Sequence, residues 1–140
     1  GSVACINGQW YIFYHRMTNG TIMSRRGCVE RIEILPDGTI PPVEMTSLGF
    51  EEALDPYEIT PADIACVLKG GATIIEKNVF ERVIINITDG CEIGYKYYDF
   101  GDDFTGKNME FSVFLTIPAR MASITAAVTA PFTSLRTTRR

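Results

Sequence analysis

The stretch that decides the fold is GQWYIFYHRMTNGTIMSRRGCVERIEILPDGTIPPVEMTS, residues 8–47. Residues 9–16 are mostly aromatic and β-branched types, which favour a strand with a pleated, half-buried surface. Asn19-Gly20 follows, and both residue types accept the positive φ angles that a tight hairpin turn requires. The first half of the stretch therefore predicts a β-hairpin.

The second half of the stretch continues this pattern. Alternate positions in residues 28–35 fall on opposite faces of a strand, and Asp37-Gly38 marks another turn. Residues 43–47 are predicted to form a short final strand. Together the segments predict a meander of three or four antiparallel strands, which suits one blade of a β-propeller. A single blade cannot cover both faces of its own sheet.

The rest of the chain divides into a linker and a second β-rich region. Residues 48–61 contain two prolines and no strand pattern, with one helical turn predicted at residues 51–54. Short predicted strands with frequent turn signals fill residues 62–130, as in a β-sandwich. These strands are predicted at 62–69, 72–77, 80–88, 91–100, 106–117 and 122–130.

The predicted fold class is therefore all-β, with antiparallel strands. A blade-like meander over residues 1–47 is followed by a linker over 48–61. A jelly-roll-like β-sandwich is predicted over 62–140, and the sequence leaves open whether it is complete.

Composition narrows the classes of partner. The chain has 140 residues, a net charge of −4 and a pI near 5.0, which argues against nucleic acid because phosphate binding requires a basic face. No apolar run approaches the roughly 20 residues that span a bilayer, so no membrane partner is expected. No signal peptide is recognisable, and extracellular and cytoplasmic locations both stay open.

The four cysteines, Cys5, Cys28, Cys66 and Cys91, form no CxxC pair and no cluster with histidine. A structural zinc site is therefore not expected. Cys66 lies in the apolar segment DIACVL, where a buried free thiol is the favoured interpretation.

The ordered strings of residues 2–16 and 24–47 resemble a known enzyme family. SVACINGQWYIFYHR and SRRGCVERIEILPDGTIPPVEMTS are similar to the last propeller blade of glycoside hydrolase family 43, which contains β-xylosidases and α-L-arabinofuranosidases. Residues 61–101 resemble a carbohydrate-binding β-sandwich of the family 6 type. The resemblance covers residues 2–117.

This resemblance implies a C-terminal fragment of a glycosidase that acts on plant hemicellulose, namely xylan or arabinan side chains. In the resembled family the catalytic carboxylates come from earlier blades, and their motifs do not occur here. We therefore expect no catalytic residue and no glycosidase activity in this chain alone, since hydrolysis needs an acid and a base in one pocket. Whether the parent prefers xylose or arabinose stays open.

Two other interpretations are weighed against this one. In the first, the chain is a purely structural β-domain that binds no sugar. In the second, it forms a homo-oligomer through open strand edges. Unpaired N–H and C=O groups on such edges invite pairing with another chain.

Four residues are candidates for substrate binding. Arg25 matches the position where the resembled family places an arginine directed at the sugar, and a guanidinium can hold hydroxyl or carboxylate groups in fixed geometry. The sole histidine, His15, is interpreted as a pocket-wall residue and not as a metal ligand, because no partner ligand is recognisable. Tyr95 and Tyr97 would share one face of a strand, and an exposed aromatic face is a platform for sugar rings.

The remaining polar and aromatic candidates are interpreted more simply. Glu30, Glu33 and Glu44 are predicted to be surface charges, and the aromatic residues of 10–14 are predicted to pack in the core. No metal ligand is assigned. A structural calcium held near Asp99, Asp102 and Asp103 is the one cofactor considered, against a simple solvated acidic turn.

Overall fold

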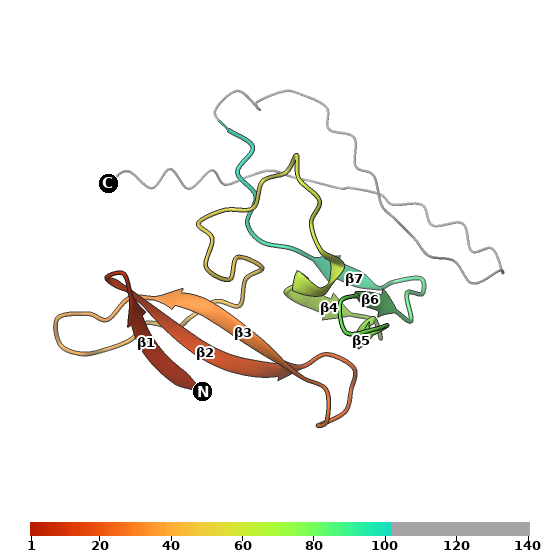
Figure 1. Cartoon of the computed structure of the whole chain (residues 1–140), viewed down its shortest axis with the longest axis horizontal. Helices are drawn as coiled ribbons and strands as arrows, with labels where there is room; N and C mark the ends of the chain where they lie inside the picture. Colours follow the sequence, from red (N-terminus) through yellow and green to blue (C-terminus); the bar gives the residue numbers. More distant parts are fainter. Residues whose placement is uncertain (102–140) are drawn as a thin grey trace. The chain divides into compact units, whose positions relative to one another are not determined.

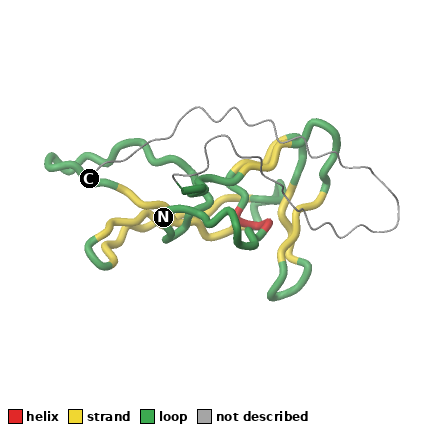
Figure 2. The backbone as a smooth tube through the Cα atoms, turned by 90° about the horizontal axis from the view of Figure 1, so that it is seen from above, coloured by secondary structure: helices red, strands yellow, loops and turns green. Residues whose placement is uncertain are grey.

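The computed structural model describes residues 1–101, which belong to one compact unit of the chain. Every paired strand in this part is antiparallel, so the predicted all-β class is confirmed (Figure 1). The helical structure in residues 1–101 is limited to one 3-10 turn, η1 (Ala62–Ile64), as Figure 2 shows. The strands are β1 (Ser2–Ile6), β2 (Gln9–Met17), β3 (Arg25–Ile32), β4 (Val67–Lys69), β5 (Thr73–Glu76), β6 (Arg82–Ile85) and β7 (Glu92–Gly94).

The first sheet is a meander of three antiparallel strands in the order β1-β2-β3, of which β2 and β3 correspond to predicted strands. The hairpin between β2 and β3 turns through Gly20, whose φ of 74° is the positive value predicted for Asn19-Gly20. The Asn19 side chain stabilises the turn by accepting a hydrogen bond from the Thr21 N–H at 3.3 Å. The sequence correctly located this hairpin because its turn chemistry is local.

The third strand of the meander differs from the prediction. Residues 43–47 form no strand, and the third strand of the sheet is β1, which pairs with β2 on the side opposite β3. The Thr46 N–H donates to the Glu30 carboxylate at 2.8 Å and the Ser47 N–H donates to the Lys96 carbonyl at 2.8 Å. Since these backbone donors bind other partners, they are not available for a strand ladder.

The linker also differs from the prediction, because residues 51–54 do not form a helical turn. The Leu54 N–H donates to the Tyr97 carbonyl at 2.7 Å, and the Asp99 N–H donates to the Leu54 carbonyl at 3.0 Å. Leu54 therefore forms a parallel bridge with Tyr98. Long-range pairing has replaced the local helical hydrogen bonds that the prediction assumed.

Two small sheets follow, β4-β7 and β5-β6. Their strands are shorter than predicted, and the start of the predicted 62–69 strand is η1. Gly70 and Gly71 turn with φ angles of 71° and 94°, as predicted. A Cβ atom on Gly70 would lie 2.8 Å from the Cα of Cys91, so this position requires glycine. The predicted strands at 106–117 and 122–130 lie outside the described residues.

The apolar core has two parts. In the first, Tyr11 packs against Phe50 with ring centroids 5.2 Å apart and a T-shaped geometry. The second contains Ala65, Cys66, Ala72 and Ile74, all buried. Cys66 is a free thiol, which confirms the prediction for this residue.

Candidate functional site

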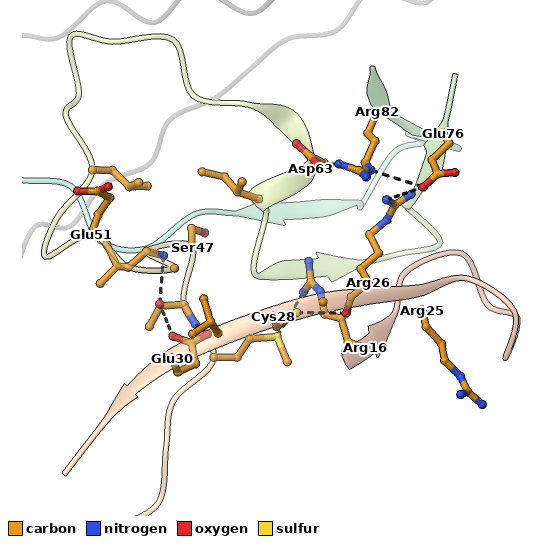
Figure 3. A pocket seen from close by; sticks show the side chains of 18 residues that line it. Arg16, Arg25, Arg26, Cys28, Glu30, Ser47, Glu51, Asp63, Glu76 and Arg82 are labelled. Carbon is orange, nitrogen blue, oxygen red and sulfur yellow. Dashed lines mark hydrogen bonds and ion pairs between the residues drawn. The ribbon is translucent and has the colours of Figure 1, made fainter. Parts of the chain in front are cut away.

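An open pocket of about 460 Å³ runs along β3 and the 45–51 segment (Figure 3). Asp63, Glu76 and Arg82 contribute its charged wall from the second half of the described region. The pocket is therefore built from segments far apart in the sequence.

The charged wall of the pocket consists of arginines that alternate with carboxylates. Arg26 donates from Nε to the Thr18 hydroxyl at 2.9 Å and reaches the Glu76 carboxylate at 3.5 Å. Arg82 bonds Asp63 at 3.3 Å and lies 3.6 Å from Glu76. Because these charges neutralise one another, the wall suits a neutral ligand rich in hydroxyl groups better than an anion.

Glu30 corrects one of the sequence predictions, because it is not a surface charge. Its exposed fraction is only 4%. One carboxylate oxygen accepts from the Thr46 N–H at 2.8 Å and from the Tyr14 hydroxyl at 3.1 Å, and the other accepts from the Thr46 hydroxyl at 2.6 Å. Both oxygens are occupied, so Glu30 acts as a structural acceptor that fixes the pocket wall. The sequence held a signal for this, since Glu30 shares its strand face with Cys28 and Ile32.

The surroundings of Glu30 change the protonation of its neighbours. Burial and the charge of Glu30 raise the pKa of the Tyr14 phenol. Burial also raises the pKa of the Cys28 thiol on the same face. Both groups therefore stay neutral at physiological pH.

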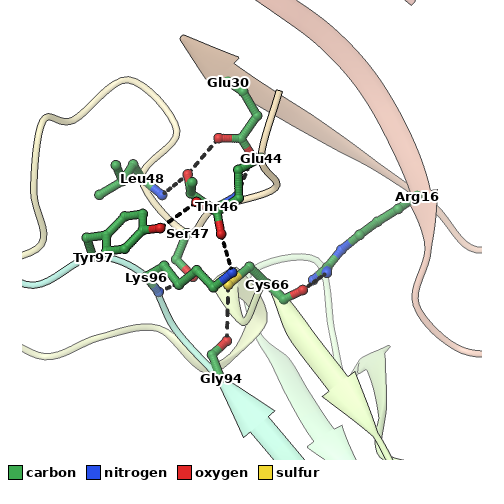
Figure 4. A network of polar contacts seen from close by, with 10 residues as sticks. All are labelled: Arg16, Glu30, Glu44, Thr46, Ser47, Leu48, Cys66, Gly94, Lys96 and Tyr97. Carbon is green, nitrogen blue, oxygen red and sulfur yellow. Dashed lines mark hydrogen bonds and ion pairs between the residues drawn. The ribbon is translucent and has the colours of Figure 1, made fainter. Parts of the chain in front are cut away.

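Arg16 connects β2 to the segment before β4. Its guanidinium donates to the Cys66 carbonyl at 3.0 Å (Figure 4). It also donates to the Ala65 carbonyl. These two carbonyls belong to buried residues, so the guanidinium supplies hydrogen bonds that water would supply poorly.

Replacing Arg16 with methionine is expected to lower the free energy of unfolding by about 1–3 kcal/mol, because the two carbonyls lose a charged donor. Methionine keeps most of the apolar stem, so the change isolates the guanidinium. Urea unfolding measures the effect. The matched control is Arg25→Met, which removes an exposed guanidinium and should change stability by less than about 0.5 kcal/mol. Equal effects of both substitutions would contradict the anchoring role.

The predicted residues His15 and Arg25 lie together on one face of the first sheet. His15 pairs with Gly27 and Met17 pairs with Arg25, so His15 and Arg25 are diagonal neighbours. Both side chains are exposed, and a Cβ on Gly27 would meet nothing within 4 Å. Arg25 has no hydrogen bond or ion pair in residues 1–101 and points away from the other labelled side chains of the pocket (Figure 3).

Tyr95 and Tyr97 do not share an exposed face, because β7 ends at Gly94 and strand alternation stops there. Tyr95 is half-buried and its hydroxyl donates to the Ala62 carbonyl at 3.1 Å. The pKa of Tyr95 is raised to about 12, mainly by burial and further by the neighbouring Tyr98 and Asp63. Tyr97 is 51% exposed. Of these two side chains, only Tyr97 is therefore largely exposed.

Tyr97 belongs to a polar cluster with Glu44 and Lys96 (Figure 4). Its hydroxyl donates to the Glu44 carboxylate, and the Lys96 ammonium bonds the same carboxylate at 2.6 Å. This hydrogen bond to Glu44 raises the pKa of Lys96. Sequence reasoning missed both partners of Tyr97, because they meet only when the 44–48 segment lies against residues 94–97.

The described residues contain no group of three His, Cys, Asp or Glu side chains that could hold a metal ion. Asp99 accepts from the Gly101 N–H at 2.8 Å, and the other two residues of the calcium prediction, Asp102 and Asp103, lie outside the described residues. In the same part of the chain, no helix has the length and apolar character needed to cross a membrane.

Comparison with known proteins gives one informative result. The chain is 43% identical to a protein named "Xylosidase/arabinosidase" from Thermoclostridium stercorarium. The match covers 71% of this chain and 26% of the relative, so the chain spans about a quarter of the length of the curated relative it matches. No protein family model matches the chain. No solved structure matches it either. The similarity relates the chain to glycoside hydrolases.

Proposed function

We propose that this chain is the C-terminal part of a family 43 glycoside hydrolase that acts on xylan or arabinan side chains. In this proposal residues 1–47 complete the catalytic propeller, and residues 62–140 form a sandwich that binds the polysaccharide. The proposal rests on the 43% identity to a protein named xylosidase/arabinosidase. The match covers only about a quarter of that protein's length, as expected for one part of a larger enzyme.

Three of the four carboxylates that line the pocket support a non-catalytic role for this chain. Glu30 has both oxygens occupied by Thr46 and Tyr14, and Asp63 and Glu76 are ion-paired with Arg82. Glycoside hydrolysis needs one carboxyl to donate a proton and another to activate water or attack the sugar. Carboxylates engaged in this way are poorly suited to either task.

The surface offers two places for sugar contact. The Tyr97 ring is exposed beside Glu44 and Lys96, whose charged groups suit the hydroxyl rim of a sugar. His15 and Arg25 lie on the first sheet, where the proposed propeller would place them at the wall of the substrate pocket. We assign polysaccharide retention by this chain to Tyr97, and substrate contact in the parent enzyme to His15 and Arg25.

The purified chain is expected to be retained on insoluble arabinoxylan and to show no hydrolysis of aryl xylosides or aryl arabinofuranosides above a buffer blank. Tyr97→Ala should lower retention several-fold, because it removes the exposed ring. Pull-down followed by gel densitometry measures retention, and Tyr57→Ala is the control because Tyr57 is also exposed and lies in the linker. Robust turnover, or no retention of the unsubstituted chain, would contradict the proposal.

One observation favours the alternative of an oligomer-forming β-domain without sugar binding. Among the described strands β1 pairs only with β2, so its outer edge is open, and Val3 and Ile6 are exposed on this strand. Open edges with apolar side chains favour pairing with another chain. Light scattering separates the two functions, since a mass that rises with concentration without arabinoxylan retention favours the alternative.

A further inference from the structure

The outer edge of β1 carries backbone groups that no other described segment binds. The two-residue turn Asn7-Gly8 joins β1 to β2, with φ angles of 50° and 84°. In such a turn the flanking residues, here Ile6 and Gln9, form a hydrogen-bonded pair, and bonded and non-bonded pairs alternate from there. Val3 and Cys5 therefore occupy non-hydrogen-bonded positions, and their N–H and C=O groups point away from β2.

This edge lacks the features that keep the strand edges of natural proteins apart. Such edges are blunted by charged side chains, by proline or by β-bulges. The sequence of β1 is SVACI, which contains neither a charged residue nor a proline. Its register with β2 runs without interruption from Ser2 to Ile6, so no bulge distorts the strand. The edge is therefore open to pairing with a further strand.

One face of β1 and β2 is apolar up to this edge. Val3 and Cys5 share that face with their cross-strand partners Ile12 and Trp10. Val3 is 43% exposed, Trp10 is 40% exposed, and the Cys5 thiol is exposed as well. A strand added at the edge would therefore cover apolar side chains as well as bind the backbone groups.

The spacing of the outward-facing groups selects the register of the added strand. Across a two-fold axis, residue i of one copy faces residue j of the other, and residue j faces residue i. An axis through Ala4 places Val3 opposite Cys5 of the second copy, and Cys5 opposite Val3. Both are hydrogen-bonded pairs, so each copy has all four of its outward-facing groups bound. An axis at Val3 or at Cys5 leaves one of these two residues without a partner inside β1 of the other copy.

We propose that this chain self-associates as a two-fold dimer in which β1 pairs with β1 of a second copy, centred on Ala4. The two first sheets then form one continuous sheet in the order β3-β2-β1-β1-β2-β3. Ile12 and Val3 of one copy continue into Cys5 and Trp10 of the other, which makes an unbroken apolar row across the junction. The pairing does not depend on sugar binding, and it gives the oligomer-forming alternative a defined contact.

Light scattering on the full chain, from micromolar to millimolar concentration, tests the association. Five residues a side bury less than the roughly 800 Å² per partner of a stable interface, so the dimer is weak and concentration-dependent. The mass is expected to rise from 15.6 kDa toward twice that value.

Two substitutions at Val3 should keep the chain monomeric. Val3→Pro removes an N–H that points to the open edge and leaves the hydrogen bonds between β1 and β2 intact. Val3→Lys places a charge on the edge, as natural proteins do to prevent such pairing. The matched control is Val79→Lys, which adds the same charge at an exposed position outside β1 and should associate like the unsubstituted chain.

Disulfide trapping tests the register. In the proposed dimer the Cα atoms of the two Ala4 residues lie about 4.5 Å apart, within the roughly 4.4–6.8 Å that a disulfide spans. Ala4→Cys is therefore expected to give a covalent dimer on a non-reducing gel after oxidation by glutathione disulfide. The two Cys5 residues would be diagonal neighbours about 7–8 Å apart, so the unsubstituted chain should give no such band.

The outcomes separate this proposal from sugar binding. A mass that stays at 15.6 kDa at every concentration overturns the dimer and leaves polysaccharide binding untouched. A mass that rises equally in Val3→Lys places the contact elsewhere and also overturns the proposal. Cross-linking of the unsubstituted chain through Cys5, without cross-linking of Ala4→Cys, shows that the register is wrong. Retention on arabinoxylan is measured separately, so the dimer and the proposed function can fail independently.

Discussion

Replacing Glu30 with alanine is expected to destabilise the described fold by about 3 kcal/mol, because several hydrogen bonds to a buried charged group are lost together. The substitution leaves the Thr46 N–H, the Thr46 hydroxyl and the Tyr14 hydroxyl without their acceptor. Water replaces the carboxylate poorly at a site where the side chain is 4% exposed. Urea unfolding followed by the fluorescence of Trp10, the only tryptophan, measures the change.

Two controls sharpen this test. Glu33→Ala removes an exposed carboxylate from the residues just after β3 and should change stability by less than about 0.5 kcal/mol. Glu30→Gln keeps one carbonyl acceptor for Thr46 and should recover about half of the loss. If Glu30→Ala unfolds at the same urea concentration as the unsubstituted chain, Glu30 does not fasten the 44–48 segment.

The Glu30→Ala substitution is also expected to disturb the surface cluster of Glu44, Lys96 and Tyr97. Thr46 lies two residues from Glu44, which bonds both Lys96 and Tyr97. The neighbouring Ser47 N–H donates to the Lys96 carbonyl at 2.8 Å, and the Lys96 N–H donates to the Ser47 hydroxyl at 3.2 Å. Glu30→Ala is therefore expected to lower arabinoxylan retention together with stability, whereas Tyr97→Ala lowers retention alone.

Ile74→Ala is the second substitution with a large expected effect, a destabilisation of about 2–5 kcal/mol from lost apolar burial and the cavity that remains. Ile74 on β5 has no exposed surface, and its N–H donates to the Thr18 carbonyl at 2.9 Å. The residue thus contributes to the second part of the core and connects it to the end of the first sheet. Thermal and urea unfolding both measure the loss.

Size and position supply the controls for Ile74. Ile74→Val removes a single methylene group and should lower stability by only about 0.5–1.5 kcal/mol. Ile75→Ala changes the next residue, which faces the other side of β5 and is half-buried, so its effect should be smaller than that of Ile74→Ala. An Ile74→Ala chain with unchanged stability would show that this core does not contribute to folding.

The predictions that succeeded rested on local chemistry. The aromatic run in residues 9–16 formed β2, and the turns at Gly20, Gly70 and Gly71 have the positive φ angles expected there. Strand preference and turn geometry depend on neighbours a few residues away, so the sequence displays them directly. The blade and the sandwich remain predictions.

The predictions that failed concerned which partners polar groups find at long range. Residues 43–47 look like a strand, but their N–H groups bind Glu30 and Lys96. Tyr95 and Tyr97 look like one platform, but one ring is turned to Ala62 and the other is exposed beside Glu44. Alternation places two side chains on one face only while the strand continues, and β7 ends at Gly94.

The sequence by itself determined the all-β class, the hairpin through Asn19-Gly20, the free buried thiol of Cys66 and the relationship to glycoside hydrolases. Tertiary structure alone decided that Thr46 supplies donors to Glu30, that Arg16 binds the Ala65 and Cys66 carbonyls, and that Glu44 meets Lys96 and Tyr97. The physical reason is the range of the interactions. A turn or strand is selected by adjacent residues, whereas a buried charge is stable only where distant segments bring it enough donors or acceptors.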